Sequence, residues 1–166
     1  VMSNLGFFHF AKANGIKVVA ANVGDRYVLE KMLESGHIIG GEQSGHIIFL
    51  EHATTGDGEL SAAKILEILC KSGKKMSELA SIMEKFPQVM INVKISAKDR
   101  EVWKNDFVIT GLIEKYEETL GDSGRILVRE SGTEPLIRVM IEGKDFKQIN
   151  QMAMKIADTI KNRVGR

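Results

Sequence analysis

Apolar residues follow two spacings along the first half of the chain, one typical of helices and one typical of short strands. Val28, Leu29, Met32 and Leu33 recur at the period of a helix that buries one side. Gly36 follows them, and a glycine is a common helix stop. Compact apolar runs separate the helical segments. The pattern predicts helices over residues 4–14, 25–35, 58–72 and 76–86, with strands over residues 17–23, 38–39 and 47–50.

The order of these segments predicts the architecture of the first half. Strands that alternate with helices indicate a parallel sheet covered by helices, with ligands at the carboxyl ends of the strands. Residues 1–4 are typical of the end of a strand, so we expect the chain to begin inside a domain. The helix over 58–72 is expected to bury a stripe of Ala62, Ile65, Leu66 and Leu69.

The pattern changes at Phe86 and Pro87, because proline disfavours helix at the residue before it. An alternating strand follows, then a helix over 105–120 and two strands over 125–130 and 136–142. Asp145 and Gln148 are typical of the start of the final helix. Its predicted buried stripe is Phe146, Ile149, Ala153, Ile156 and Ile160. We therefore predict a small α+β domain over residues 87–166, after an α/β domain over residues 1–86.

Composition narrows the functional classes. Of the 166 residues, 23 are Lys or Arg and 22 are Asp or Glu, so no overall field favours nucleic acid or a membrane surface. No apolar run reaches the roughly 18 residues of a membrane span. The single cysteine, Cys70, cannot form a disulfide within the chain, which suits the cytoplasm. His9, His37 and His52 lack metal-ligand spacing, and no three acidic residues alternate, so no metal site is predicted.

A polar segment over residues 129–135 lies between the last two predicted strands and has the chemistry of a phosphate site. Arg129 can hold phosphate oxygens with two parallel donors, and Ser131 and Thr133 add hydroxyl donors. Gly132 can expose backbone amides. A polar hairpin turn with surface ion pairs is the alternative.

Two acidic residues, Glu130 and Glu134, belong to this segment, although a carboxylate would repel a bound phosphate. Side chains alternate along an extended chain, so Glu130 should face away if Arg129 and Ser131 face the ligand. Glu134 would orient Arg129 or Arg138. Arg138 itself has two interpretations, as a support of the phosphate loop or as a surface strand residue.

A second polar segment, residues 40–46, lies between the short apolar runs of the first half. Glu42, Ser44 and His46 are two residues apart, a spacing that suits one extended face. A carboxylate, a hydroxyl and an imidazole together can hydrogen-bond the hydroxyls of a sugar. A loop whose polar groups satisfy one another is the alternative. Asp25 and Arg26 also follow a predicted strand end. Residues at this position can contact a ligand, and the alternative is that they cap the next helix.

Together these segments make the chain resemble the C-terminal part of the α-D-phosphohexomutases, over essentially all of its length. The resemblance rests on residues 1–4, 40–46, 55–58 and 129–135, which follow the family's order. It implies part of an α/β/α domain 3 followed by a TATA-binding-protein-like domain 4. It also implies a sugar-binding set of Glu42, Ser44, His46, Asp25 and Arg26, and a phosphate-binding set of Arg129, Ser131, Gly132 and Thr133. We add Arg138 to the phosphate-binding set as the expected support of that loop.

The resemblance further implies an isomerase that moves phosphate through an enzyme phosphoserine and a sugar 1,6-bisphosphate. The serine and the ligands of Mg²⁺ would belong to domains outside this chain, so we expect the isolated chain to be inactive. Gln43 favours a member that acts on glucosamine phosphates in amino sugar and cell wall precursor metabolism. Members acting on mannose or glucose phosphates, and a non-catalytic phosphosugar-binding protein, are the alternatives. Expected partners are a hexosamine phosphate, the N-terminal domains of the same enzyme and a second copy in a homodimer, not nucleic acid or membranes.

Overall fold

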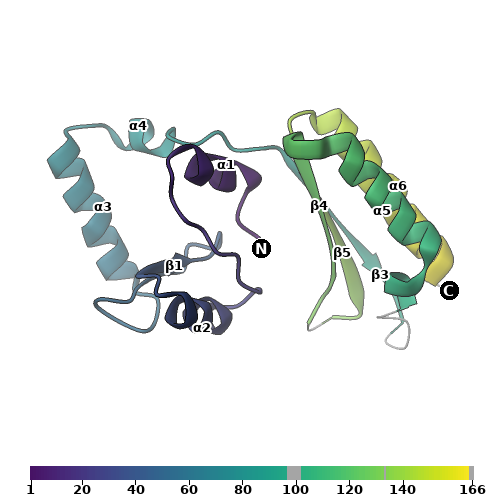
Figure 1. Cartoon of the computed structure of the whole chain (residues 1–166), viewed down its shortest axis with the longest axis horizontal. Helices are drawn as coiled ribbons and strands as arrows, with labels where there is room; N and C mark the ends of the chain where they lie inside the picture. Colours follow the sequence, from purple (N-terminus) through teal and green to yellow (C-terminus); the bar gives the residue numbers. More distant parts are fainter. Residues whose placement is uncertain (97–101, 133, 165–166) are drawn as a thin grey trace. The chain divides into compact units, whose positions relative to one another are not determined.

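The computed structural model describes residues 1–96, 102–132 and 134–164. The chain divides into two compact units, Val1–Lys85 and Phe86–Arg166. Figure 1 shows the helices and strands of both units. None of the helices in the described ranges has the length and apolar character needed to cross a membrane. The elements of the first unit are α1 (Leu5–Ala13), α2 (Asp25–Ser35), β1 (Ile39–Gly41), β2 (Ile47–Phe49), α3 (Gly58–Ser72) and α4 (Met76–Ala80).

Local capping chemistry determines where the helices of the first unit begin and end. The Asn4 side chain accepts a hydrogen bond from the Gly6 amide at 3.0 Å and starts α1. The Asp57 carboxylate accepts from the Leu60 amide at 2.9 Å and starts α3. Gly36 ends α2 in the left-handed conformation, with φ of 70°. The predicted α1, α2 and α3 are therefore confirmed as helices. Leu33, predicted on the buried side of α2, is 62% exposed, whereas Met32 is buried.

The sheet of the first unit is an antiparallel pair of β1 and β2, with Gly40 opposite Ile48. The mixture of helices and strands predicted for the chain is confirmed, but no parallel pairing occurs among the described residues. Only the short segment 42–46 separates the two strands, and a connection of that length joins antiparallel neighbours, because a parallel crossover needs a dozen residues or more.

The strand predicted over residues 17–23 is not formed. Residues 16–22 have no regular secondary structure, although the amine of Val1 donates to the Ala21 carbonyl at 2.8 Å. A strand is stabilised by ladder hydrogen bonds to a neighbour, and the described part of the chain forms no ladder with this segment. β-branched residues alone do not supply that neighbour.

The burial predicted for α3 is also wrong. Its side chains are all at least partly exposed, and Leu66 keeps 60% of its surface accessible. Helical periodicity identifies the apolar face of a helix but does not provide a surface to cover it. α4 is shorter than predicted and ends at Ala80, where the amide and hydroxyl of Ser81 both bond to the Glu78 carbonyl.

The second unit is a three-stranded antiparallel sheet in the order β3–β5–β4, with α5 and α6 covering one face (Figure 1). This confirms the predicted α+β arrangement of strands and helices. Its elements are β3 (Gln88–Lys94), η2 (Val102–Asn105), α5 (Phe107–Leu120), η3 (Gly121–Ser123), β4 (Gly124–Glu130), β5 (Leu136–Gly143) and α6 (Phe146–Val164).

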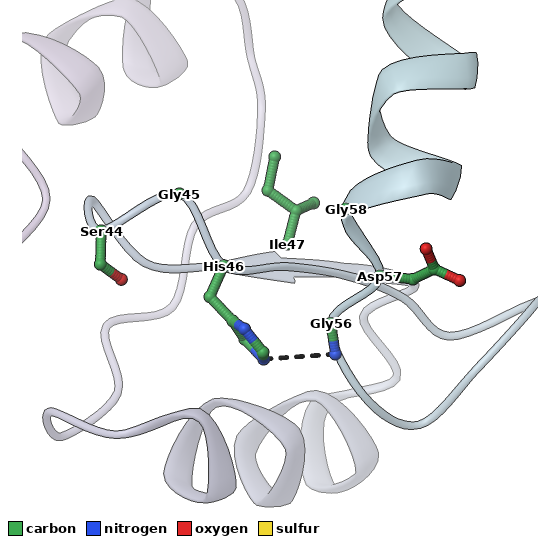
Figure 2. Close-up of a pocket in the computed structure, with 7 residues that line it drawn as sticks. All are labelled: Ser44, Gly45, His46, Ile47, Gly56, Asp57 and Gly58. Carbon is green, nitrogen blue, oxygen red and sulfur yellow. Dashed lines mark hydrogen bonds between the residues drawn. The ribbon is translucent and has the colours of Figure 1, made fainter.

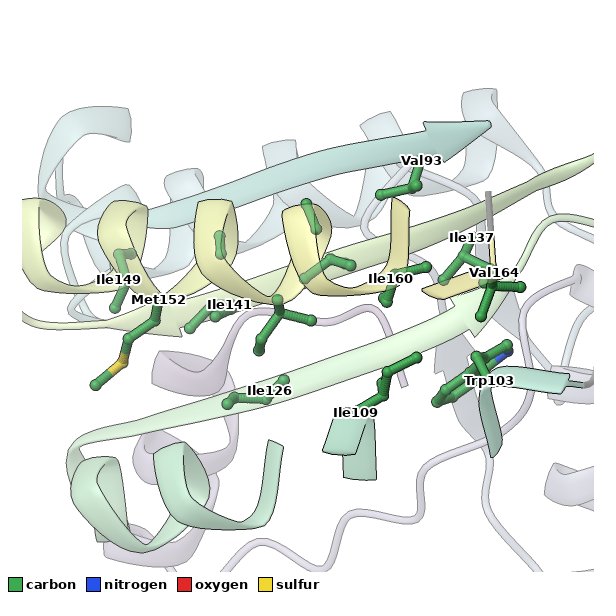
Figure 3. Packing of buried hydrophobic residues seen from close by; sticks show 14 of the residues in the cluster. Val93, Trp103, Ile109, Ile126, Ile137, Ile141, Ile149, Met152, Ile160 and Val164 are labelled. Atoms are coloured by element: carbon green, nitrogen blue, oxygen red, sulfur yellow. The ribbon is translucent and has the colours of Figure 1, made fainter. Parts of the chain in front are cut away.

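The core of the second unit lies between this sheet and α6, as Figure 3 shows. Ile137, Val139 and Ile141 of β5 are fully buried, and they alternate with residues of the opposite face. The predicted α6 stripe is fully buried as well, except for Phe146, which is the first residue of the helix and stays exposed. The carboxylates of Asp106 and Asp145 accept hydrogen bonds from backbone amides in the first turns of α5 and α6, which have no partner within the helix.

Gly111→Ala should stabilise the second unit. Gly111 lies inside α5, and a Cβ built there meets no other atom within 4 Å. Alanine restricts the unfolded chain, so we expect the free energy of unfolding to rise by about 0.5–1 kcal/mol. Urea denaturation followed by the fluorescence of Trp103, which is buried in this core, would measure the change.

Gly143→Ala is the matched control for Gly111→Ala. Its Cβ would lie 2.7 Å from the Ile149 side chain. The same chemical change should therefore lower the free energy of unfolding. A fall in stability for both variants would contradict the argument from helix propensity.

Candidate functional site

The polar segment between β1 and β2 is a tight hairpin turn. The Glu42 amide donates to the His46 carbonyl at 2.9 Å, and the Gly45 amide donates to the Glu42 carbonyl at 3.0 Å. Gly45 has φ of 97°, a conformation that favours glycine. The predicted extended arrangement of Glu42, Ser44 and His46 is therefore wrong, because the chain reverses direction between them.

The Glu42 carboxylate connects this turn to the start of α2. Its Oε1 accepts a hydrogen bond from the Gly24 amide at 3.1 Å. Gly24 immediately precedes α2, and a carboxylate near a helix N-terminus is favoured by the helix dipole. The contact brings the segments around residues 24 and 42 together, although they are distant in sequence.

The imidazole of His46 connects the same turn to the segment that precedes α3. Its Nε2 accepts a hydrogen bond from the Gly56 amide at 3.2 Å (Figure 2). Oδ2 of Asp25 lies 3.8 Å from the same nitrogen. A pocket of about 410 Å³ is present here, and its lining residues are Ser44, Gly45, His46, Ile47, Gly56, Asp57 and Gly58.

The remaining predicted sugar-binding residues occupy different positions. Ser44 is exposed and lines the pocket. Asp25 is the first residue of α2 and does not cap it; its Oδ1 accepts from the Arg26 amide, and Gly24 is the N-cap. The Arg26 side chain extends along the helix and pairs with Glu30 at 2.9 Å, with 83% of its surface exposed. That hydrogen bond raises the pKa of Arg26.

The predicted phosphate segment joins β4 to β5. Ser131 is buried, and its amide donates to the Leu136 carbonyl at 2.9 Å. The Glu134 amide donates to Ser131 Oγ at 3.3 Å, which leaves the hydroxyl proton of Ser131 available to an acceptor. Gly132 is exposed. Thr133 lies outside the described residues.

Two arginines face each other across the strands that flank this segment. Arg129 of β4 pairs in register with Arg138 of β5, on the sheet face opposite the core residues Val128 and Val139. Like charges directly opposite one another destabilise a sheet. Burial, and then the charge of Arg138, lower the pKa of Arg129. An anion placed between the two guanidiniums would relieve this repulsion.

The acidic residues of the segment leave the arginines accessible to an anion. Glu130 pairs with Lys104 at 2.8 Å, on the face opposite Arg129, as the sequence predicted. Of the two partners considered for Glu134, the structure selects Arg138, at 3.6 Å. Nε of Arg138 is buried and has no hydrogen-bond partner among the described residues. Buried donors of this kind usually have a partner.

Sequence reasoning missed the backbone amides of Gly24 and Gly56 as partners of the candidate side chains. Both glycines stand in short motifs beside an aspartate, but nothing in those motifs indicates which side chain each amide would meet. Within residues 1–96, 102–132 and 134–164, no three His, Cys, Asp or Glu side chains are grouped closely enough to hold a metal ion.

Two family models match the chain. One is described as phosphoglucomutase/phosphomannomutase, alpha/beta/alpha domain III, and it matches residues 1–86. The other is described as phosphoglucomutase/phosphomannomutase, C-terminal domain, and it matches residues 90–159.

Several relatives named phosphoglucosamine mutase align with nearly the whole chain. The protein from Acetivibrio thermocellus is 54% identical over 99% of this chain and 37% of its own length. The proteins from Caldanaerobacter subterraneus and Finegoldia magna are 52% and 50% identical, over 99% and 98% of this chain and 37% and 36% of their own lengths. The chain thus spans little more than a third of these relatives.

Solved structures share the fold at low sequence identity. An Aspergillus fumigatus N-acetylphosphoglucosamine mutase variant in complex with glucose 1,6-bisphosphate gives a TM-score of 0.74 at 15% identity, over 100% of this chain and 38% of that one. The same enzyme with GlcNAc-6P and magnesium gives 0.70 at 16% identity, over 96% and 40%. A Burkholderia thailandensis phosphoglucomutase/phosphomannomutase family protein gives 0.71 at 20% identity, over 96% and 35%.

Proposed function

The chain belongs to the phosphoglucomutase/phosphomannomutase family, and we propose that it forms the substrate-binding C-terminal portion of a phosphoglucosamine mutase. The observation that carries the proposal is the pair of facing arginines beside the Ser131 turn. Two adjacent cations repel each other across the sheet, and an anion bound between them would offset that repulsion. In this proposal residues 1–86 recognise the sugar and residues 87–166 hold its phosphate.

The phosphate site would consist of Arg129, Arg138, Ser131, Gly132 and Thr133. The guanidiniums supply charge-assisted donors, and the Ser131 hydroxyl adds a donor. Glu134 holds Arg138 from one side, at 3.6 Å. Phosphate has several acceptor oxygens, so it can satisfy these donors together.

The sugar site would consist of Glu42, Ser44, His46, Asp25 and Arg26. Glu42 is an acceptor, and one of its oxygens is already held by the Gly24 amide, so its orientation is fixed before a ligand binds. Ser44 and His46 line the pocket, which Glu42 does not line, and they can donate to sugar oxygens. Arg26 has the weakest support, because its side chain is engaged by Glu30.

In the complete enzyme these sites would serve two phosphoryl transfers. A phosphoserine outside this chain would pass its phosphoryl group to the free hydroxyl of glucosamine 6-phosphate, giving the 1,6-bisphosphate. The intermediate would then turn over and return its other phosphoryl group to the serine, giving glucosamine 1-phosphate. Either phosphate could occupy the arginine site while the sugar site holds the ring. Such positioning supplies much of the catalysis in phosphoryl transfer.

The described residues of this chain do not fit a magnesium site, since they contain no suitable group of ligands. One matched structure contains magnesium. We therefore assign the Mg²⁺ ligands to the part of the enzyme that this chain does not span. The roles proposed for the residues of this chain do not include binding Mg²⁺. Without that part, the isolated chain should bind substrate but not convert it.

The cellular setting follows from the same assignment. We propose that the enzyme works in the cytoplasm, where hexosamine phosphates occur, and supplies amino sugar precursors. Its partners would be the hexosamine phosphate and the N-terminal domains of the same enzyme, with a homodimer as the proposed assembly. Nearly balanced charge gives no reason to expect nucleic acid or membrane binding.

A chimera tests the proposed function directly. Residues 1–166 would replace the matching segment of the Acetivibrio thermocellus relative, which is 54% identical. We expect the chimera to interconvert glucosamine 6-phosphate and glucosamine 1-phosphate faster than the corresponding mannose or glucose phosphates. Preference for one of the other sugars would reassign the substrate. A folded chimera that binds hexosamine phosphate without converting it would favour a non-catalytic binding protein.

Glu42→Ala should separate sugar recognition from phosphate recognition. The change removes a carboxylate that accepts sugar hydroxyls, so we expect glucosamine 6-phosphate to bind about tenfold more weakly, while inorganic phosphate binds unchanged. Calorimetric titration of both ligands would measure this. Equal losses for the two ligands would indicate a general folding defect and would contradict the assigned role.

A further inference from the structure

The imidazole of His46 has a defined hydrogen-bonding state. Its Nε2 accepts from the Gly56 amide at 3.2 Å, and a backbone amide can only donate. A ring nitrogen that accepts carries no proton, so the proton of the neutral ring must be on Nδ1. Within the described part of the chain, Nδ1 has no hydrogen-bond partner.

Gly56 also lies unusually close to the same ring. A Cβ built on Gly56 would be 2.3 Å from Cε1, 2.5 Å from Nε2 and 2.6 Å from Nδ1 of His46. The ring therefore lies directly against the Cα of Gly56, as Figure 2 illustrates. Gly56 is not among the described glycines with positive φ. Proximity of the ring, not backbone conformation, is the reason for a glycine here.

The carboxylate of Asp25 favours a different state of the ring. Its Oδ2 is 3.8 Å from Nε2, too far for a hydrogen bond, and a carboxylate would pair with Nε2 only if that nitrogen carried a proton. The Gly56 amide is nearer and occupies Nε2 as a donor. In the neutral ring, Gly56 and Asp25 thus compete for one nitrogen, and the geometry favours Gly56.

We propose that Gly56 is a positioning residue that holds neutral His46 in the Nδ1–H tautomer. His46 then presents a donor to the pocket that it lines. Glu42 presents an acceptor at the same hairpin turn. A ligand with both hydroxyl hydrogens and oxygen acceptors would match this pair, which deepens the sugar site described above and rests on the proposed function. The Nε2–H tautomer would instead offer an acceptor at Nδ1.

Nuclear magnetic resonance of the ¹⁵N-labelled, ligand-free 166-residue chain tests the tautomer. The spectrum would be recorded at a pH where imidazole is neutral. We expect the two ring nitrogens of His46 to show the shifts of a protonated Nδ1 and an unprotonated Nε2. The opposite pattern, or equal averaging of the two shifts, would overturn the proposal. This measurement needs no variant and no enzymatic activity.

Two alanine substitutions test the role of Gly56. Gly56→Ala should displace the ring and remove the Nδ1–H pattern, whereas Gly58→Ala should preserve it, because a Cβ at Gly58 meets nothing within 4 Å. An unchanged tautomer in a folded Gly56→Ala variant would overturn the positioning role. If Gly56→Ala does not fold, the tautomer of the unmodified chain still decides the proposal.

Ligand titrations distinguish failure of this inference from failure of the proposed function. For Gly56→Ala we expect the affinity for glucosamine 6-phosphate to fall about three- to tenfold, with inorganic phosphate affinity unchanged. Sugar binding with the Nε2–H tautomer would overturn only the inference. The Nδ1–H tautomer without any sugar phosphate binding would support the positioning of His46 and would refute the proposed function.

Discussion

Arg129→Ala is expected to weaken phosphate binding by about 1.5–3 kcal/mol, which is roughly ten- to a hundredfold in affinity. In the proposed site the guanidinium would make charge-assisted hydrogen bonds to phosphate that no neighbouring side chain can replace. Arg138 is held by Glu134 from one side, so it cannot cover both positions. Titration of the chain with inorganic phosphate and with glucosamine 6-phosphate should show similar losses, because both ligands use the same site.

Removal of the Arg129 charge should lower phosphate affinity without lowering the free energy of unfolding. Arg129 faces Arg138 across the β4–β5 ladder, and this repulsion disappears when one charge is removed. Arg129→Gln keeps most of the side-chain stem, so we expect its free energy of unfolding to stay the same or rise while phosphate affinity falls. A binding loss that accompanied a matching loss of stability would contradict the assignment.

Lys155→Ala provides the control for Arg129. Lys155 is an exposed cation on α6, which covers the face of the sheet opposite the arginines. We expect its removal to leave phosphate affinity unchanged. If it weakened binding as much as Arg129→Ala, general attraction by positive charge would explain the result and the specific site would be rejected.

Ile156→Ala should produce the largest loss of stability, about 2–5 kcal/mol. Ile156 lies at the middle of the buried stripe of α6 and has no accessible surface. Its removal costs transfer free energy and leaves a cavity against the sheet, which the regular packing of β5 cannot readily fill. Urea denaturation followed by Trp103 fluorescence reports on this unit, because Trp103 is the single tryptophan and belongs to the same core.

Met154→Ala is the matched control for this substitution. Met154 lies on the same helix but is half-exposed, and its truncation should cost less than about 0.5 kcal/mol. A cost below 1 kcal/mol for Ile156→Ala, or equal costs for both variants, would contradict the description of this core.

The elements of the second unit were predictable because local sequence patterns indicate each of them. Helical spacing predicted that Ile149 and Ile160 are buried, and both lie in this core. Asp145 marked the start of α6, where its carboxylate accepts from the Lys147 amide. Each signal was local, and the partner that buries it lies in the same unit.

The first unit was less predictable, because a strand needs a neighbouring strand and an apolar helix face needs a surface that covers it. Periodicity does not show whether either is present. The β-branched segment around Val18 has the composition of a strand but no ladder among the described residues. Leu66 lies on an apolar helical face and is nevertheless exposed. The starts of α1 and α3 were still predicted well, since Asn4 and Asp57 act through backbone amides only a few residues away, whereas the end of α4 was not.

For the candidate site, the sequence by itself determined which chemical groups are present and that they belong to two turns. Arg129, Ser131, Glu42 and His46 could all be named from residue type and flanking apolar runs. Only the tertiary structure decided their neighbours: Arg138 opposite Arg129, and the Gly56 amide against His46. The physical reason is that a side chain's donors and acceptors are fixed by its covalent structure, whereas strand register and long-range packing select the group that each one meets.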